Sequence, residues 1–256
     1  SVQTHHGYIH VTGTDEDHCY ITATLRAQAE SIEKANEIAE MTTIRFDNSQ
    51  DKTAVVIDKP VQFQDYGVYV SYEIRLPQKT SVTLGTTHGE IVCSNLRGTV
   101  TASTTHDSIR CSDINGDQNL NTTHGAIKLT DITGPVTART THNTIEAERI
   151  TGNSEFNTTH GRVVCRDMNS PTLRVLTSHN NVDISFTPDV ESEIKTDITT
   201  SHGNIVFHVP PSFGGRVSLL TTHGKMKTDI PLLVMGETSE DNLQGTIGDG
   251  NGNINL

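Results

Sequence analysis

Hydrophobic and polar residues alternate in short runs along most of this chain, and the runs recur at a fixed period. From position 86 to position 224 the phrase Thr-Thr-His-Gly appears eight times with small changes, and the first five copies are evenly spaced, at His88, His106, His124, His142 and His160. Each interval contains two alternating segments, which is the pattern of two short strands with one buried face. A period of about 20 residues is typical of repeat architectures, so the sequence predicts a β-solenoid of stacked coils.

The aliphatic residues keep their place in each repeat, so stacking the repeats arranges them in columns. The third residue after each histidine gives Ile91, Ile109, Ile127, Ile145, Val163, Val182 and Ile205, and the fifth gives Cys93, Cys111, Leu129, Ala147, Cys165, Ile184 and Phe207. These columns are the predicted core, and three of the four cysteines belong to it. A Cys93–Cys111 disulfide stays open if the two residues are direct neighbours, because stacked strands lie about 5 Å apart.

The residue after the histidine suggests a second possible period. It alternates through Gly89, Asp107, Gly125, Asn143, Gly161, Asn180 and Gly203 before Gly224 breaks the pattern. Two coil lengths are therefore open. Either each 18-residue repeat forms one coil with a single histidine column, or two repeats form one 36-residue coil with two columns on opposite sides. In both cases the residues of a column lie about 4.8 Å apart.

Residues 1–80 lack the repeat and have the mixed pattern of an α+β cap. Alternating segments predict strands near residues 8–11, 19–25, 53–57 and 68–76, and residues 27–41 predict one amphipathic helix. A solenoid needs such a cap because its end coil exposes core and unpaired strand edges. The prediction is an all-β, single-domain β-solenoid with a cap over residues 1–80 and repeats over residues 81–256, and residues 245–256 add a last strand that is either paired or an open edge.

Composition narrows the classes of function. Hydrophobic residues make up 33% and aromatic residues 4% of the chain, which suits a thin and regular core. The net charge of −12 argues against nucleic acid and anionic membranes as partners. No apolar run is long enough for a membrane span. The chain begins at Ser1 rather than Met, as a mature exported protein or a trimmed chain would.

The repeated histidines are the main candidate for chemistry. The predicted metal ligands are His88, His106, His124, His142, His160, His179, His202 and His223. Imidazole nitrogens suit zinc, copper or nickel, and with a Zn–N bond of about 2.0–2.1 Å one ion can link rings from adjacent coils. The neighbouring threonines would orient the rings, and Asp107 would add a carboxylate at one coil.

A structural ladder is the competing interpretation of the same column. Stacked identical side chains can hydrogen-bond along a column, as asparagine ladders do. Val100, Ala102, Thr104 and His106 share strand parity, which predicts that the ring points inward if no bulge intervenes. Five further histidines lie off the column, namely His5, His6, His10, His18 and His208, although His5-His6-Gly7 resembles a ninth turn.

Other functions, including catalysis, have less support in the sequence. Asp113, Asp131 and Asp167 each follow a histidine by seven residues, but aspartate is favoured at such turns for its backbone hydrogen bonds. No nucleophile–base pair or phosphate loop is recognisable, so no enzymatic activity is expected. Threonine arrays also fit ice-binding surfaces, and solenoids also act on polysaccharides, so ice binding and polysaccharide binding remain alternatives. Because both chain ends carry solenoid pattern, joining Leu256 to Ser1 of another copy would extend the stack into a fibre.

Several segments together resemble the bacterial putative-adhesin β-solenoid family, whose members are mostly uncharacterised. The resemblance lies in Val70-Ser-Tyr-Glu-Ile-Arg-Leu-Pro77, in Thr87-His88-Gly89-Glu90-Ile91, in residues 6–13 and in residues 245–256, and it covers nearly the whole chain. It implies a right-handed β-solenoid or stacked-strand fold, usually exported, without catalytic residues. The sequence departs from that family by placing histidine where serine or asparagine is common.

These expectations combine into one hypothesis. The chain is predicted to be an exported, non-enzymatic, adhesin-like structural protein at the cell surface or in the periplasm, whose histidine column binds zinc, copper or nickel. The alternative is a scaffold with a hydrogen-bonded His/Thr ladder that assembles head-to-tail. Metal ions and further copies of the chain are the expected partners, beside an unidentified surface or matrix component, and neither nucleic acid nor membrane insertion is expected.

Overall fold

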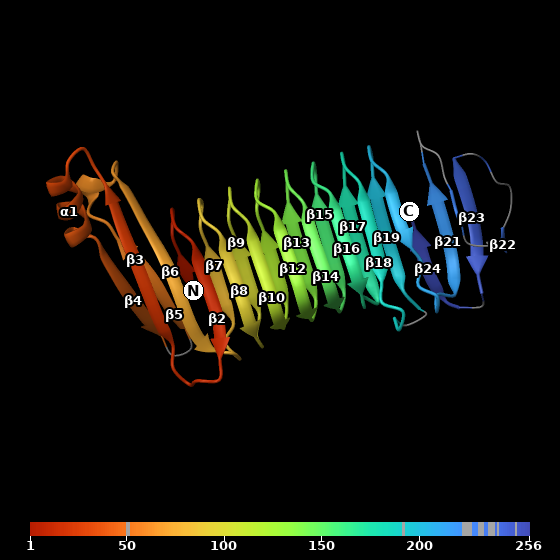
Figure 1. The fold of residues 1–256 in the computed structure, drawn as a ribbon, viewed down its shortest axis with the longest axis horizontal. Coiled ribbons are helices and arrows are strands. Elements are labelled where there is room, and N and C mark those ends of the chain that lie inside the picture. Colours follow the sequence, from red (N-terminus) through yellow and green to blue (C-terminus); the bar gives the residue numbers. More distant parts are fainter. Residues whose placement is uncertain are drawn as a thin grey trace. The chain divides into compact units, whose positions relative to one another are not determined.

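The computed structural model describes residues 1–49, 52–190, 193–221, 227–229, 233–234, 239, 241–248 and 250–256. These residues form 24 strands, one α-helix and one short 3-10 helix, η1 (Val61–Phe63), which confirms the all-β prediction. The chain divides into two compact units, residues 1–128 and residues 129–256, and the division falls within β12 (Ile127–Thr133). Figure 1 labels the helix and most of the strands and colours them along the sequence. The predicted boundary at residue 80 stays a prediction.

Unit 1 consists of two sheets whose strands are mostly parallel. Its strands are β1 (Val2–Gln3), β2 (Ile9–Thr14), β3 (Tyr20–Gln28), β4 (Thr43–Ser49), β5 (Lys52–Asp58), β6 (Gly67–Pro77), β7 (Val82–Gly85), β8 (Ile91–Leu96), β9 (Val100–Ser103), β10 (Ile109–Asn115) and β11 (Gln118–Asn121). One sheet has the order β11-β9-β7-β1-β5-β4 and the other the order β10-β8-β2-β6-β3. Only β4, on β5, and β3, on β6, pair antiparallel among the described strands of this unit.

The strand register settles the length of the coil. Ile109 pairs with Ile91, and Gln118 pairs with Val100, so each strand lies beside the strand one repeat before it in the same sheet. One coil therefore holds a single 18-residue repeat and contributes one strand to each sheet. The 36-residue alternative is wrong for these coils, and each unit carries one column of histidines.

The N-terminal segment forms a coil inside the stack of unit 1. β1 lies between β5 and β7, and β2 lies between β6 and β8, in each case in parallel pairing. The turn between β1 and β2 contains His6, which forms a β-bridge with His88. The resemblance of His5-His6-Gly7 to a ninth turn is thereby confirmed.

The helix is shorter than the sequence predicts. α1 spans Ile32–Met41, and the Ser31 hydroxyl caps it by accepting a hydrogen bond from the Lys34 backbone N–H at 3.2 Å. Ala27 and Gln28 instead extend β3, opposite residues at the start of β6. Strand pairing prevails over the helical periodicity there, because the hydrogen bonds between β3 and β6 stabilise these residues more than their helix propensity does.

Unit 2 repeats the arrangement of paired sheets. Its strands are β13 (Val136–Thr140), β14 (Ile145–Thr151), β15 (Ser154–Thr158), β16 (Val163–Met168), β17 (Thr172–Thr177), β18 (Val182–Phe186), β19 (Lys195–Thr200), β20 (Ile205–His208), β21 (Gly215–Leu220), β22 (Leu233–Val234), β23 (Asn242–Ile247) and β24 (Gly252–Asn255). Their order is β22-β23-β21-β24-β19-β17-β15-β13 in one sheet and β20-β18-β16-β14 in the other.

Both terminal strands have neighbours on each side. β24 pairs in parallel with β19 and with β21, so the alternation near the C-terminus is a paired strand rather than an open edge. β1 is likewise enclosed between β5 and β7 in unit 1. A fibre in which Leu256 of one copy continues into Ser1 of the next is therefore wrong, because the edges of β1 and β24 that it needs are already hydrogen-bonded within the chain.

The predicted aliphatic columns form the core of each unit. Ile91 and Ile109 in unit 1, and Ile145 and Val163 in unit 2, are 0% exposed. Only the last members, Ile205 and Phe207, are half-buried, because β20 is an edge strand.

The four cysteines are free thiols, three of them buried as predicted. Cys93 and Cys111 pair directly across neighbouring strands. A hydrogen bond between these two thiols, together with burial, raises the pKa of Cys93 well above its usual value.

Candidate functional site

The first threonine of each turn fastens neighbouring coils together. In unit 1 the buried Thr104 and Thr122 hydroxyls donate to the backbone carbonyls of Gly89 and Asp107, each at 3.2 Å. The same bond recurs along both units, from Thr86 to Gly7, Thr158 to Asn143, Thr177 to Gly161 and Thr200 to Asn180, at 3.1–3.2 Å. In each unit a ladder of threonine hydroxyls therefore lies beneath the turns.

The histidine rings lie on the outside of these turns. His106 is exposed, although Thr104 two residues earlier is buried. Strand parity predicted an inward ring, and that expectation is wrong because residues 104–107 lie outside the strands, where the bend rotates the next side chain outward. All seven described members of the predicted column are exposed, namely His88, His106, His124, His142, His160, His179 and His202. His223 lies outside the described residues.

The exposed rings stack face to face along each unit. In unit 1 the ring centroids of His88 and His106 are 4.1 Å apart with an interplanar angle of 6°, and those of His106 and His124 are 5.3 Å apart at 8°. In unit 2, the rings from His142 to His202 stack at 4.9–5.3 Å with interplanar angles of 3–10°. The backbone holds this spacing, since the N–H groups of His106, His124, His160, His179 and His202 each donate to a carbonyl of the preceding turn, as His106 does to Thr87 at 3.1 Å.

Parallel stacking limits what neighbouring rings can bind together. A metal ion lies in the plane of the imidazole that binds it, about 2.0–2.1 Å from the nitrogen for zinc. The lone pairs of two parallel rings point in the same direction and do not converge on one ion. In this conformation the rings offer separate nitrogens, so an ion shared by two neighbouring rings would require one of them to rotate. At His106 the Nδ1–H donates to the Thr87 carbonyl at 3.2 Å, which leaves Nε2 as the ligand atom.

One place in the described residues brings three potential ligand atoms together. His5, His6 and His88 each present a ring nitrogen, and these atoms lie within 4.8 Å of one another. His88 was a predicted ligand, whereas His5 and His6 were not assigned to the site. The sequence signal was the turn Thr4-His5-His6-Gly7, in which His5 replaces the second threonine of the repeat.

The surroundings of His6 favour its neutral imidazole form. Burial, and then the positive charges of His5, His88 and Lys59, lower the pKa of His6 below its usual value. The Lys59 ammonium is held by the carbonyls of Gln64 and Tyr66 at 2.9 and 3.0 Å. Neutral imidazole is the form that binds metals.

The aspartates that recur after the histidines have a conformational role. Asn95, Asp113, Asp131, Arg149 and Asp167 all have left-handed backbone conformations, with φ between 51° and 57°. Asparagine and aspartate are enriched in that region, which supports the turn interpretation of this row over a catalytic one. Arg149 is the exception, and its guanidinium donates to both carboxylate oxygens of Asp131 at 2.6 and 3.1 Å, which lowers the pKa of Asp131.

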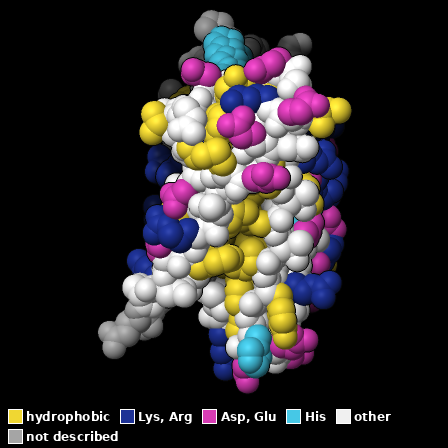
Figure 2. Space-filling model, turned by 90° about the vertical axis from the view of Figure 1, so that its left-hand side faces the viewer, with side chains coloured by type: hydrophobic (Ala, Val, Ile, Leu, Met, Phe, Trp, Pro, Cys, Tyr) yellow, Lys and Arg dark blue, Asp and Glu magenta, His cyan; other side chains and the backbone are white. Residues whose placement is uncertain are grey.

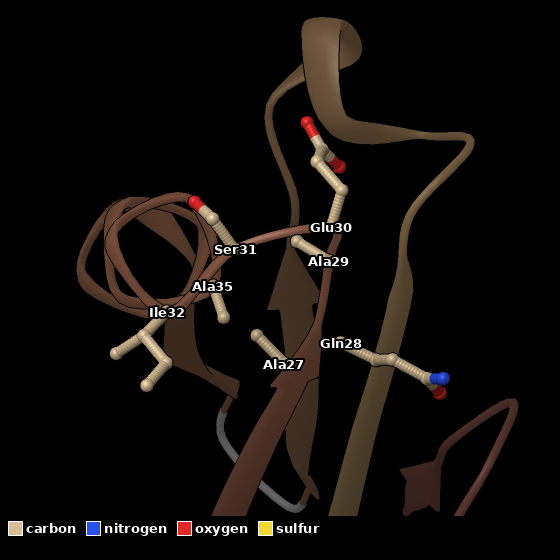
Figure 3. A pocket seen from close by; sticks show the side chains of 7 residues that line it. All are labelled: Ala27, Gln28, Ala29, Glu30, Ser31, Ile32 and Ala35. Atoms are coloured by element: carbon tan, nitrogen blue, oxygen red, sulfur yellow. The ribbon is translucent and has the colours of Figure 1, made fainter.

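A shallow hollow lies between β3 and α1 in unit 1 (Figure 3). It has a volume of about 320 Å³ and is lined by Ala27, Gln28, Ala29, Glu30, Ser31, Ile32 and Ala35. Ala27 and Ala35 face each other across it, whereas Gln28 and Glu30 point away. The Glu30 carboxylate accepts from the Tyr66 hydroxyl at 3.2 Å, so the one carboxylate of this lining has a structural partner.

Comparison with known proteins adds little to this geometry. No family model matches the chain, and no curated protein matches it. A similar solved structure is a putative cell adhesion protein from Clostridium sporogenes ATCC 15579, with 14% sequence identity and a TM-score of 0.26, covering 80% of this chain and 89% of that chain. A likeness of this size identifies neither a shared fold nor a shared function. In the part of the chain that the structure describes, no helix is long and apolar enough to cross a membrane.

Proposed function

We propose that this chain is an exported, non-enzymatic, adhesin-like structural protein whose turn histidines take up divalent transition-metal ions. The observation that carries the proposal is the column of exposed, stacked imidazoles that follows the turns of each unit, including His88, His106 and His124 in unit 1 and His142, His160, His179 and His202 in unit 2.

The hydrogen bonding of the turns supports a role for the rings beyond folding. The threonine hydroxyls and the backbone N–H groups already join one turn to the next. An exposed ring adds little to that network, and serine or asparagine would serve a ladder equally well. Imidazole differs from both in binding zinc, copper and nickel strongly. Repeated histidine at an exposed position is therefore better explained by metal uptake, with water or a partner chain completing each coordination sphere.

Metal titration of the untagged full chain tests this proposal. At pH 7.5 we expect calorimetry with zinc or copper to give more than one ion per chain, and at pH 5.5 we expect release, because ring protonation competes with the metal. The double variant His106→Asn with His124→Asn should take up fewer ions while keeping its melting temperature without metal. If the chain takes up no metal at pH 7.5, the proposal is wrong, and the alternative of a structural scaffold with a hydrogen-bonded His/Thr ladder remains.

Self-association is a second candidate function, and the open end of unit 1 favours it. β3 and β4 are the last strands of their sheets, and Ile21, Ala23 and Leu25 on the core side of β3 are only half-buried. Figure 2 shows hydrophobic side chains in a strip down the middle of this end, and Phe46 of β4 is 48% exposed. Unpaired edges beside an apolar strip fit a second copy of the chain.

Light scattering over a range of protein concentrations tests self-association. We expect the average mass to rise with concentration, and Phe46→Lys to abolish the rise because it places a charge at an exposed apolar position of the edge strand β4. Thr24→Lys is the matched control, since Thr24 is exposed on the other face of β3. A mass that stays that of one chain at all concentrations would exclude this candidate.

A further inference from the structure

We propose that His5, His6 and His88 form a three-nitrogen binding site for one divalent transition-metal ion, at which the chain binds metal most tightly. This inference deepens the proposed function and rests on it for the chemistry of the rings. It can nevertheless hold if the rest of the column binds nothing, because its geometry is different.

The orientation of His5 distinguishes this place from the rest of the column. Its ring makes an angle of 72° with the ring of His6 and 81° with that of His88, whereas rings along the column are nearly parallel. The lone pairs of perpendicular rings can point at a common position, which parallel rings do not allow. His6 and His88 stack at 4.7 Å with a tilt of 28°, so their planes also converge slightly.

The distances require only a small adjustment to receive an ion. Three nitrogens around tetrahedral zinc, each at about 2.0–2.1 Å from the ion, lie about 3.4 Å from one another. The three ligand atoms here lie within 4.8 Å of one another, so rotations that move each nitrogen by about 1 Å close the site. His5 and His88 are exposed and His6 is half-buried, which leaves room for such rotations.

The backbone holds the three residues in place. The His88 N–H donates to the His5 carbonyl at 3.0 Å, and the Gly7 N–H donates to the His88 carbonyl at 2.9 Å. These bonds belong to the pairing of one coil on the next, so the ligands stand on a rigid element rather than on a free N-terminal segment.

A threonine orients the ring that makes the site. The Thr87 hydroxyl lies 3.0 Å from Nδ1 of His5, which leaves Nε2 of that ring for the ion. Partners of this kind fix ring orientation and typically change metal affinity by about 10- to 100-fold. Thr87 is the second threonine of its own turn, so the ordinary repeat already supplies the orienting hydroxyl. His5 is the one residue of the site that differs from the other turns.

The ligand set decides the class of ion. Three imidazoles without a carboxylate suit zinc or copper, whereas calcium and magnesium require oxygen ligands. Three protein ligands also leave one tetrahedral position open for water or for a side chain of a partner protein. Zinc is therefore the probe for affinity, and cobalt, which takes similar geometry, is the spectroscopic probe.

The test uses His5→Thr in the untagged full chain, which restores the turn of the other coils. We expect the tightest zinc site to weaken on the order of 100-fold or more, with loss of the cobalt visible band. His88→Asn should do the same, and His106→Asn, one coil further along the column, should leave this site unchanged. Melting curves without metal check that each variant is folded.

A gain of site is the complementary experiment. Thr105→His places a histidine before His106 and beside the coil of His124, with Thr123 in the position that Thr87 has in the native site. We expect a second tight zinc ion per chain. Failure of this variant to bind an additional tight ion would contradict the role assigned to the His-His turn.

The outcomes separate this inference from the proposed function. If His5→Thr removes one tight ion and the double variant at His106 and His124 changes nothing, the three-histidine site stands and the column does not. If His5→Thr leaves zinc affinity intact while the double variant lowers the ion count, the column stands and this inference falls. If the native chain binds no zinc at pH 7.5, both are wrong.

Discussion

Gly125→Ala is expected to lower the free energy of unfolding of unit 1 by about 3 kcal/mol or more, because the added methyl group has no space. A Cβ at position 125 would lie 1.6 Å from the carbonyl oxygen of Asp107 and 2.3 Å from its carbonyl carbon. Both atoms are backbone and cannot rotate away, so the turn itself would have to shift. Chemical denaturation of the variant and of the native chain measures the loss.

Asp107→Ala provides the matched control for this prediction. Asp107 has the same place in its turn as Gly125, one coil earlier, and its side chain is exposed. Its replacement should change stability by less than about 0.5 kcal/mol, as is usual for exposed positions. Equal effects of the two substitutions would mean that the turns are not packed as closely as the structure has them.

This close contact explains why the residue after the histidine alternates between glycine and Asp or Asn along the repeats. A Cβ at Gly125, Gly161 or Gly203 would lie 1.6–2.1 Å from the carbonyl oxygen of the Asp or Asn in the preceding turn. Glycine on alternate coils thus reflects close approach between neighbouring turns. The alternation suggested a 36-residue coil, but an 18-residue coil with two kinds of turn produces the same sequence.

The core was predictable because it depends on two local regularities. Strand alternation selects the buried residues and the 18-residue period stacks them, so the columns that begin at Ile91 and Cys93 follow from the sequence alone. The outward direction of His106 could not be predicted in this way, because side chains alternate between two faces only along a strand, and the bend after Thr104 interrupts that alternation. The helix start was also misplaced, because pairing of Ala27 with Val68 is a tertiary effect.

The three-histidine cluster could not be predicted from the sequence either, because it depends on a contact between distant parts of the chain. His5 meets Thr87 across 82 positions of the chain, and only the insertion of the N-terminal coil beside β7 and β8 brings them together. The pattern Thr-His-His-Gly identified residues 4–7 as a turn, but it gave no indication of which coil would be its neighbour.

Thr158→Val is expected to destabilise unit 2 by about 2–4 kcal/mol, although valine has nearly the same shape. The Thr158 side chain is 1% exposed, and its hydroxyl donates to the Asn143 carbonyl at 3.2 Å and accepts from the Gly161 N–H at 3.0 Å. Valine removes the partner of both groups and leaves the Gly161 N–H buried without it, and an unsatisfied buried group costs about 1–3 kcal/mol. The lost bond to the partly buried Asn143 carbonyl adds about 1 kcal/mol. Denaturant titration of the variant measures the loss.

Two substitutions in the same turn complete this experiment. Thr158→Ser keeps the hydroxyl and removes one methyl group, so it should cost only about 1 kcal/mol. His160→Asn should cost still less without metal, because the His160 ring is exposed and its backbone N–H, which donates to the Thr141 carbonyl at 2.8 Å, is retained. A large loss at His160 and a small one at Thr158 would reverse the assignment, making the rings the ladder that holds the turns. The expected order instead assigns the fold to the threonines and leaves the histidines available for metal.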